Sequence, residues 1–115
     1  MRTIMKVSIP VEPGNAAIED GSLPATVMAF VEQMKPEAVY FFAEAGRRTG
    51  LFVFDLQDPT MIPSIAEPFF MKLGAAVEMH PTMNLEEMKA GVAKATAKRT
   101  GPARGAHAAA PQSPR

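Results

Sequence analysis

The most regular hydrophobic pattern lies in residues 38–56, AVYFFAEAGRRTGLFVFDL, which include five Tyr or Phe side chains. Two short, nearly continuous apolar runs flank a polar centre, and this pattern predicts two β-strands joined by a tight turn at residues 44–48. Side chains alternate between the two faces of a strand, so apolar residues occupy both faces here. We therefore expect cover on both sides of the sheet.

Two other stretches have apolar residues spaced as on one face of a helix. Ser22 is a candidate N-cap for the first, and Lys35 and Pro36 close it. Asp58 and Pro59 open the second in the same way, Pro68 is expected to kink or divide it, and Gly74 ends it. The segment 14–20 accepts a helical turn, but Gly21 and Pro24 interrupt any longer helix. The two apolar stripes are Val27, Phe30, Val31 and Met34, then Ile62, Ile65, Phe69 and Leu73.

Strands are also predicted at residues 2–9 and 75–80, where apolar and polar positions alternate. Asn84 and Glu87 have the spacing of a capping box, which predicts a last helix that frays near Lys98. Residues 96–115 are rich in Ala, Pro, Gly and Arg, and we expect a disordered basic tail after a folded domain of residues 1–95.

The order of these elements is βαββαβ followed by an extra helix. This order predicts an α+β, ferredoxin-like fold with an antiparallel four-stranded sheet. Both main helices then cover one sheet face and leave the other, the open face, uncovered. We expect the covered face to carry Val7, Val39, Phe41, Val53, Val77 and Met79. The open face is expected to carry Lys6, Ser8, Tyr40, Phe42, Phe52, Phe54, Glu78 and His80, an apolar patch too large for a monomer to expose.

Composition excludes several classes of function. The chain has 115 residues and no cysteine, so thiol catalysis and cysteine-held metal clusters are excluded, and a reducing, cytoplasmic location is expected. No apolar span approaches a membrane helix. The net charge is zero, but without Lys98, Arg99, Arg104 and Arg115 eight basic residues face twelve acidic ones, which argues against nucleic-acid binding. Four tail charges without aromatics are a weak signal for nucleic acid. We expect no metal and no cofactor.

With this element order, and with AAVEMHP running into the capped helix NLEEMKAGV, the chain resembles the dimeric α/β-barrel superfamily over residues 3–95. Members of that superfamily pack two ferredoxin-like subunits through their open sheet faces. They include muconolactone isomerases, cofactor-free quinol monooxygenases, haem-degrading enzymes and stress-responsive barrels, and small uncharacterised members are most similar to this chain. The resemblance implies a homodimer and a cavity between sheet and helices. No catalytic motif of a member is matched residue by residue.

Three polar residues of the open face are candidates for catalysis. His80 shares a strand face with Glu78, and a carboxylate beside an imidazole favours proton transfer on an enolisable substrate. The i, i+2 spacing does not ensure contact, and a half-exposed histidine at a strand end is the alternative. Tyr40 has a hydroxyl for a ligand oxygen, or for a bond to a partner subunit. Lys6 and Glu44 either form an ion pair across the open face or reach solvent at opposite ends of the sheet.

Candidate ligand-binding residues are Lys6, Phe42, Phe52 and Phe54, although phenylalanines in such positions are more often barrel core than an aromatic cage. Arg47 and Arg48, between glycines, form a hairpin turn without a following helix, so they predict no phosphate loop. They could still meet an anion at that turn, but solvent is their expected surrounding. The leading hypothesis is a homodimer with a mostly apolar pocket for a small organic ligand, as a cofactor-free isomerase or monooxygenase if it is an enzyme. The alternative is a non-enzymatic binding or assembly module whose open face is only a packed interface.

Overall fold

The computed structural model describes residues 1–99, which form two units: Met1–Thr82, and a second that begins at Met83. The elements of the first unit are β1 (Arg2–Ile9), α1 (Val11–Glu19), α2 (Ser22–Met34), β2 (Ala38–Glu44), β3 (Arg47–Asp55), a 3-10 turn η1 (Pro59–Met61), α3 (Ile62–Leu73) and β4 (Ala76–Pro81). The second unit contains α4 (Leu85–Arg99). No helix in the described part is long and apolar enough to cross a membrane.

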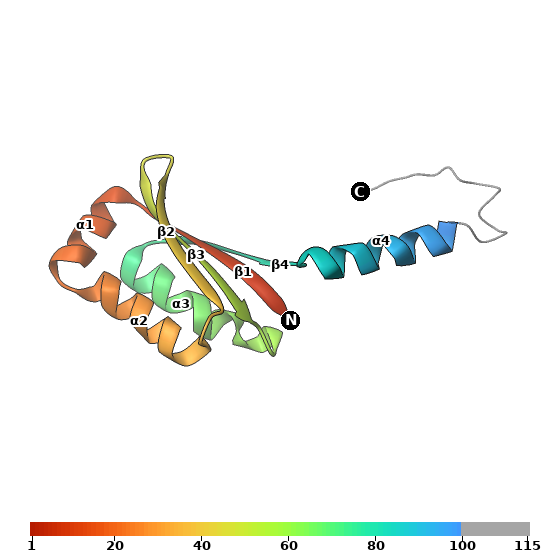
Figure 1. Ribbon diagram of the computed structural model, residues 1–115. Helices are drawn as coiled ribbons and strands as arrows, with labels where there is room; N and C mark the ends of the chain where they lie inside the picture. Colours follow the sequence, from red (N-terminus) through yellow and green to blue (C-terminus); the bar gives the residue numbers. More distant parts are fainter. Residues whose placement is uncertain (100–115) are drawn as a thin grey trace. The chain divides into compact units, whose positions relative to one another are not determined.

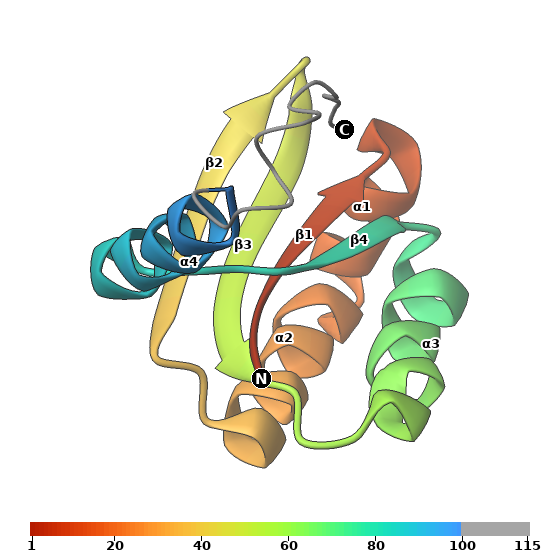
Figure 2. The ribbon, with the colours of Figure 1, turned by 90° about the vertical axis from the view of Figure 1, so that its right-hand side faces the viewer.

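The first unit is an α+β layer structure. Its four strands form one open sheet in the order β2-β3-β1-β4, and every neighbouring pair is antiparallel. Helices α1, α2 and α3 all lie on one side of this sheet (Figure 1), and β2, β3 and β1 lie side by side in Figure 2. This arrangement is compatible with a ferredoxin-like fold.

A two-residue turn sets the register of the β2–β3 hairpin. Ala45 and Gly46 both have positive φ, 55° and 75°. Two successive positive φ values are typical of the type I′ turn, whose twist matches that of the flanking strands. Glu44 therefore pairs directly with Arg47, and further along Val39 pairs with Phe52.

This register corrects the predicted faces of β3. Phe52 and Phe54 are each only 1% exposed and lie on the helix-covered face, so their placement on the open face was wrong. Val53 was predicted on the covered face, and it lies on the open face beside Ile4. A pairing shifted by one residue moves every side chain of a strand to the opposite face. The turn was predicted over five residues, which left that shift unresolved.

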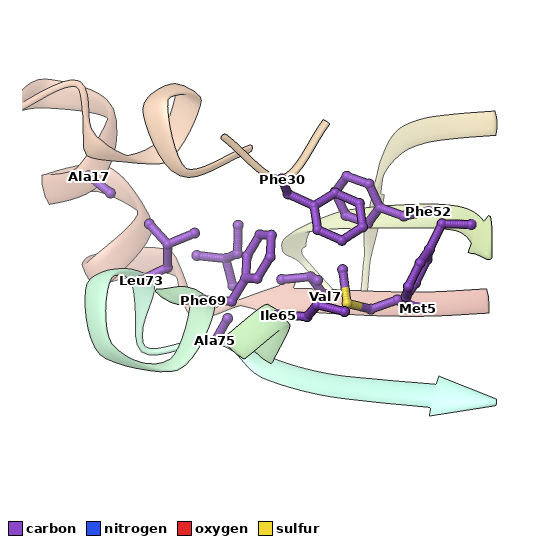
Figure 3. Close-up of a cluster of buried hydrophobic side chains, with 11 residues drawn as sticks. Met5, Val7, Ala17, Phe30, Phe52, Ile65, Phe69, Leu73 and Ala75 are labelled. Carbon is purple, nitrogen blue, oxygen red and sulfur yellow. The ribbon is translucent and has the colours of Figure 1, made fainter. Parts of the chain in front are cut away.

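The hydrophobic core joins the covered sheet face to α2 and α3. Phe30 of α2 lies at its centre and meets Phe52, Phe54 and Phe69 edge-on, at ring-centroid distances of 5.0, 5.3 and 6.0 Å. Edge-to-face packing of this kind adds stability beyond the burial of area. Met5 of β1 is fully buried beneath the rings (Figure 3).

The ambiguous segment after the first strand is the helix α1, which begins immediately after Pro10. Pro13 lies in its first turn, where a missing N–H costs no helical hydrogen bond. The Asp20 carboxylate accepts a hydrogen bond from the Ser22 backbone N–H at 2.8 Å. Ser22 is therefore the first residue of α2, where it had been predicted as the N-cap.

The predicted caps of the next helical stretch are confirmed. Asp58 accepts a hydrogen bond from the Thr60 backbone N–H at 2.9 Å, and Gly74 ends α3 with a positive φ of 59°. Pro68 lies inside α3, yet the helix is continuous from Ile62 to Leu73. Of the two predicted effects of Pro68, a kink or a division of the helix, the division does not occur, and the kink stays a prediction.

The helix of the second unit begins with the predicted capping box. Asn84 Oδ1 accepts from the Glu87 backbone N–H, and Glu87 Oε1 accepts from the Asn84 backbone N–H, both at 2.8 Å. These reciprocal bonds satisfy two backbone donors at the helix start. The helix continues to Arg99, past the expected domain end at residue 95. The rest of the predicted tail, residues 100–115, lies outside the described residues.

Candidate functional site

A pocket of about 610 Å³ lies within the first unit, between the covered face of the sheet and the helices α1 and α2. We call it the sheet–helix pocket. Its position is at the end of the sheet that carries the β2–β3 turn. The residues that line it are Val7, Ile9, Val11, Asn15, Leu23, Val27, Phe41, Phe42, Ala43, Gly46, Arg47, Arg48, Thr49, Gly50, Phe52 and Phe69.

The walls of the pocket are mostly apolar and belong to the core. Val7 of β1 and Phe69 of α3 are each 1% exposed, and Phe52 is equally buried. Leu23 and Val27 of α2 are partly buried against the same core. Because core side chains are closely packed, these walls are held in place by the fold itself.

Gly50 lies in the middle of the pocket wall, where two aromatic rings cover it. It pairs with Val7 on one side and Phe41 on the other, on the covered face. A Cβ atom at this position would lie 2.9 Å from Phe52 Cε1 and 3.3 Å from Phe41 Cε1. The two rings therefore extend over the Gly50 backbone, where any larger residue would collide with them.

Arg48 brings a positive charge to the rim of this apolar space. Its Nη2 donates to Asn15 Oδ1 at 3.0 Å and its Nη1 to the Val11 carbonyl at 3.5 Å, so both partners belong to α1. Both are uncharged oxygens. No acidic residue is among those lining the pocket. Arg47 borders it too, but its register position, opposite Glu44, is on the open face. The rim is therefore electropositive.

The predicted catalytic residues lie away from this pocket. Tyr40 is 61% exposed on the open face. His80 Nε2 and Glu78 Oε1 are 3.6 Å apart, and these two side chains are 64% and 60% exposed. None of the three lines the sheet–helix pocket. Their catalytic role stays a prediction.

The predicted ligand-binding residues are divided between the two sides of the sheet. Phe52 lines the pocket from the covered face, and Phe54 belongs to the buried core. Phe42 borders the pocket as well, although its register position opposite Thr49 is on the open face. Lys6 forms an ion pair with Glu44 at 2.8 Å, which is the pairing across the face that the sequence left open. The hydrogen bond to Glu44 and its charge raise the pKa of Lys6, with a smaller contribution from the charge of Glu78.

The residues that give the pocket its shape and charge were not predicted to form a site. Gly50 and Arg48 were assigned to a solvated turn, with an anion at Arg48 only as the alternative, and Asn15 was assigned to an ambiguous segment. One pattern in the sequence indicates the site. Arg48, Gly50, Phe52 and Phe54 occupy every second position, so the charge of Arg48 lies on the same strand face as two core aromatic rings.

No protein-family model matches the chain, and a search of curated proteins finds no similar sequence. Within residues 1–99, no three His, Cys, Asp or Glu side chains are grouped so that they could hold a metal ion.

Proposed function

We propose that this protein binds a small, mostly apolar organic molecule in the sheet–helix pocket. The observation that carries the proposal is the pocket of about 610 Å³ with core-supported apolar walls. Ligand pockets typically have volumes of roughly 300–1,000 Å³ and combine apolar walls with a few polar groups. Asn15 and Arg48 provide such groups at one end.

We further infer that the first unit has the ferredoxin-like topology of the dimeric α/β-barrels, with a second copy of the chain covering the open face. Tyr40 and Phe42 are exposed there, and Ile4, Leu51 and Val53 are only half-buried. The ion pair of Lys6 with Glu44 balances charges within this face. An apolar patch with balanced charges favours a self-complementary interface.

The side chains of the pocket favour binding over turnover. Its polar residues are Asn15, Arg47, Arg48 and Thr49, and no His, Asp, Glu, Lys, Tyr or Cys side chain lines it. Those residue types supply most general acids and bases. The non-enzymatic binding module is therefore our first proposal. The second is a cofactor-free isomerase or monooxygenase, which would require His80, Glu78 and Tyr40 to reach the ligand in the dimer.

A pair of tryptophan variants on α2 tests the binding proposal. Leu23→Trp adds bulk inside the pocket, whereas Met28→Trp adds the same ring on the 52% exposed outer side of the helix. The probes are a panel of neutral naphthalene and cyclohexane amides, and 2-naphthamide is the reference member. Ligand-observed NMR measures the binding of each probe.

We expect the wild type and Met28→Trp to bind members of the panel alike. Leu23→Trp should bind them at least about tenfold more weakly, the loss that corresponds to 1.4 kcal/mol. Thermal unfolding of each variant shows whether it is folded at the temperature of the titration. Equal binding by Leu23→Trp and Met28→Trp would overturn the proposal, as would a wild type that binds no apolar probe, neutral or charged.

A further inference from the structure

Arg48 differs from an ordinary surface arginine in its position. It precedes Gly50 and Phe52 at two-residue steps on the covered face of β3, so it points toward the helices. Along this row the pocket wall changes from the charge of Arg48, to a glycine covered by aromatic rings, to the buried ring of Phe52. The four-residue advance from Arg48 to Phe52 spans about 13 Å along the strand, the length of a small molecule with one or two rings.

The contacts of Arg48 fix its position without neutralising it. Asn15 Oδ1 and the Val11 carbonyl hold the guanidinium against α1. Neither acceptor carries a charge. A guanidinium has five N–H donors, and these two contacts leave others for a ligand. In the described part of the chain, no carboxylate forms an ion pair with Arg48.

The backbone of α1 gives this guanidinium room. A Cβ atom on Gly14 would lie 2.7 Å from Arg48 Nη1, so the missing side chain lets the guanidinium rest against the helix. An arginine that is already ordered loses less conformational freedom when it binds an anion. Arg48 is thus positioned in advance of binding.

We propose that the ligand of the sheet–helix pocket is an organic carboxylate, with its apolar body beside Gly50 and Phe52 and its carboxylate on Arg48. The proposal rests on the proposed function and adds the chemical class of the ligand. A carboxylate matches the planar fork of a guanidinium, with two parallel N–H···O bonds. The electropositive rim selects an anion, and the apolar walls exclude inorganic anions as good ligands.

The test compares 2-naphthoate with 2-naphthamide, two molecules of nearly the same shape that differ in charge. The intact wild-type chain is titrated with each by calorimetry or ligand-observed NMR. We expect 2-naphthoate to bind at least about tenfold more tightly, as charge-assisted hydrogen bonds require. The preference should decrease as salt is added, because the rim is open to solvent.

Variants of Arg47 and Arg48 show which arginine is responsible for the preference for 2-naphthoate over 2-naphthamide. Arg48→Gln should bring the affinities for the two probes to within about twofold, with that for 2-naphthamide unchanged. Arg48→Lys, which retains the charge without the fork, should show an intermediate preference. Arg47→Gln, a matched change at the neighbouring lining residue, should retain most of the wild-type preference. Each variant is first checked by its thermal unfolding.

The results separate this inference from the proposed function. If the wild type binds both probes equally well, or if folded Arg48→Gln and Arg48→Lys both retain the full preference, the ligand class is wrong while the binding site stands. If no apolar probe of either charge binds, the proposed function fails, and the inference fails with it.

Discussion

Gly14 and Arg48 lie in contact although they are 34 positions apart in the chain: a Cβ atom on Gly14 would stand 2.7 Å from Arg48 Nη1. The same Cβ would lie 3.2 Å from Ile9 Cγ2, a tight contact that requires only a small shift. This helical glycine thus leaves room for the guanidinium of Arg48 at the rim of the sheet–helix pocket.

Gly14→Ala should displace Arg48 and leave the fold intact. Alanine is favoured over glycine in a helix by up to about 1 kcal/mol, which offsets the crowding at Ile9. We expect an unchanged or slightly higher melting temperature and weaker binding of 2-naphthoate, with binding of 2-naphthamide unchanged. Calorimetric titration measures both affinities. A variant that retains the full preference for the carboxylate would show that the position of Arg48 is unimportant.

Phe52 should be essential for stability because it is fully enclosed by the core. Its ring meets Phe30 and Phe69 at 5.0 and 6.1 Å. Phe52→Ala is expected to lower the free energy of unfolding by about 3–5 kcal/mol, as for other buried phenylalanines. Phe70→Ala, a change at a 42% exposed ring of α3, should cost far less. Urea denaturation provides both values, and similar losses for the two variants would contradict the position of Phe52.

Local patterns in the sequence predicted most elements but could not fix one register. The helical stripe around Phe30 and the capping box at Asn84 depend on residues close in sequence, so both were found. The faces of β3 depend on whether the turn has two residues, and Ala45 gives no clear signal for a positive φ. Because of that single shift, Phe52 was predicted on the open face, where the structure has Val53.

The candidate site was less predictable because it depends on contacts between distant segments. Asn15 and Arg48 are brought together by the docking of α1 beside β3. Pro13 and Gly14 obscured α1 in the sequence, since both residues are rare within helices. Without that helix, Arg48 had no partner that would distinguish it from a solvated turn residue.

Val53 tests the proposed dimer. It lies on the open face between Ile4 and Ala38, so Val53→Lys would place a charge in an interface formed by a second copy. We expect light scattering to show a dimer for the wild type and a monomer for Val53→Lys at the same concentration. Met28→Lys, on the outer side of α2, should remain dimeric. A monomeric wild type would contradict the dimer.

Asp58 should make stability depend on acid pH. Hydrogen bonds from the Thr60 backbone N–H and hydroxyl lower the pKa of Asp58. Because the pKa is lower in the folded chain than in the unfolded one, this stabilisation is fully present above the unfolded pKa of about 4. It is lost as the pH falls through the folded pKa.

Replacement of Asp58 by asparagine should remove this contribution. Asparagine is a good N-cap without a charge, so Asp58→Asn should lose less stability than the wild type between neutral pH and strong acid. Thr60→Val retains the backbone N–H but removes the hydroxyl, so its loss of stability in acid should lie between those of the wild type and Asp58→Asn. Thermal unfolding across that range measures the effect, and parallel pH profiles for wild type and Asp58→Asn would contradict it.

The most direct test of the account is a residue-resolved NMR titration of the wild-type chain with 2-naphthoate. Binding in the sheet–helix pocket predicts that the largest amide shift changes occur at Asn15, Val27 and Gly50, with little change on the open face. If the largest changes instead occur at Tyr40, Glu78 and His80, the ligand binds to the other side of the sheet, and the account of the pocket is wrong.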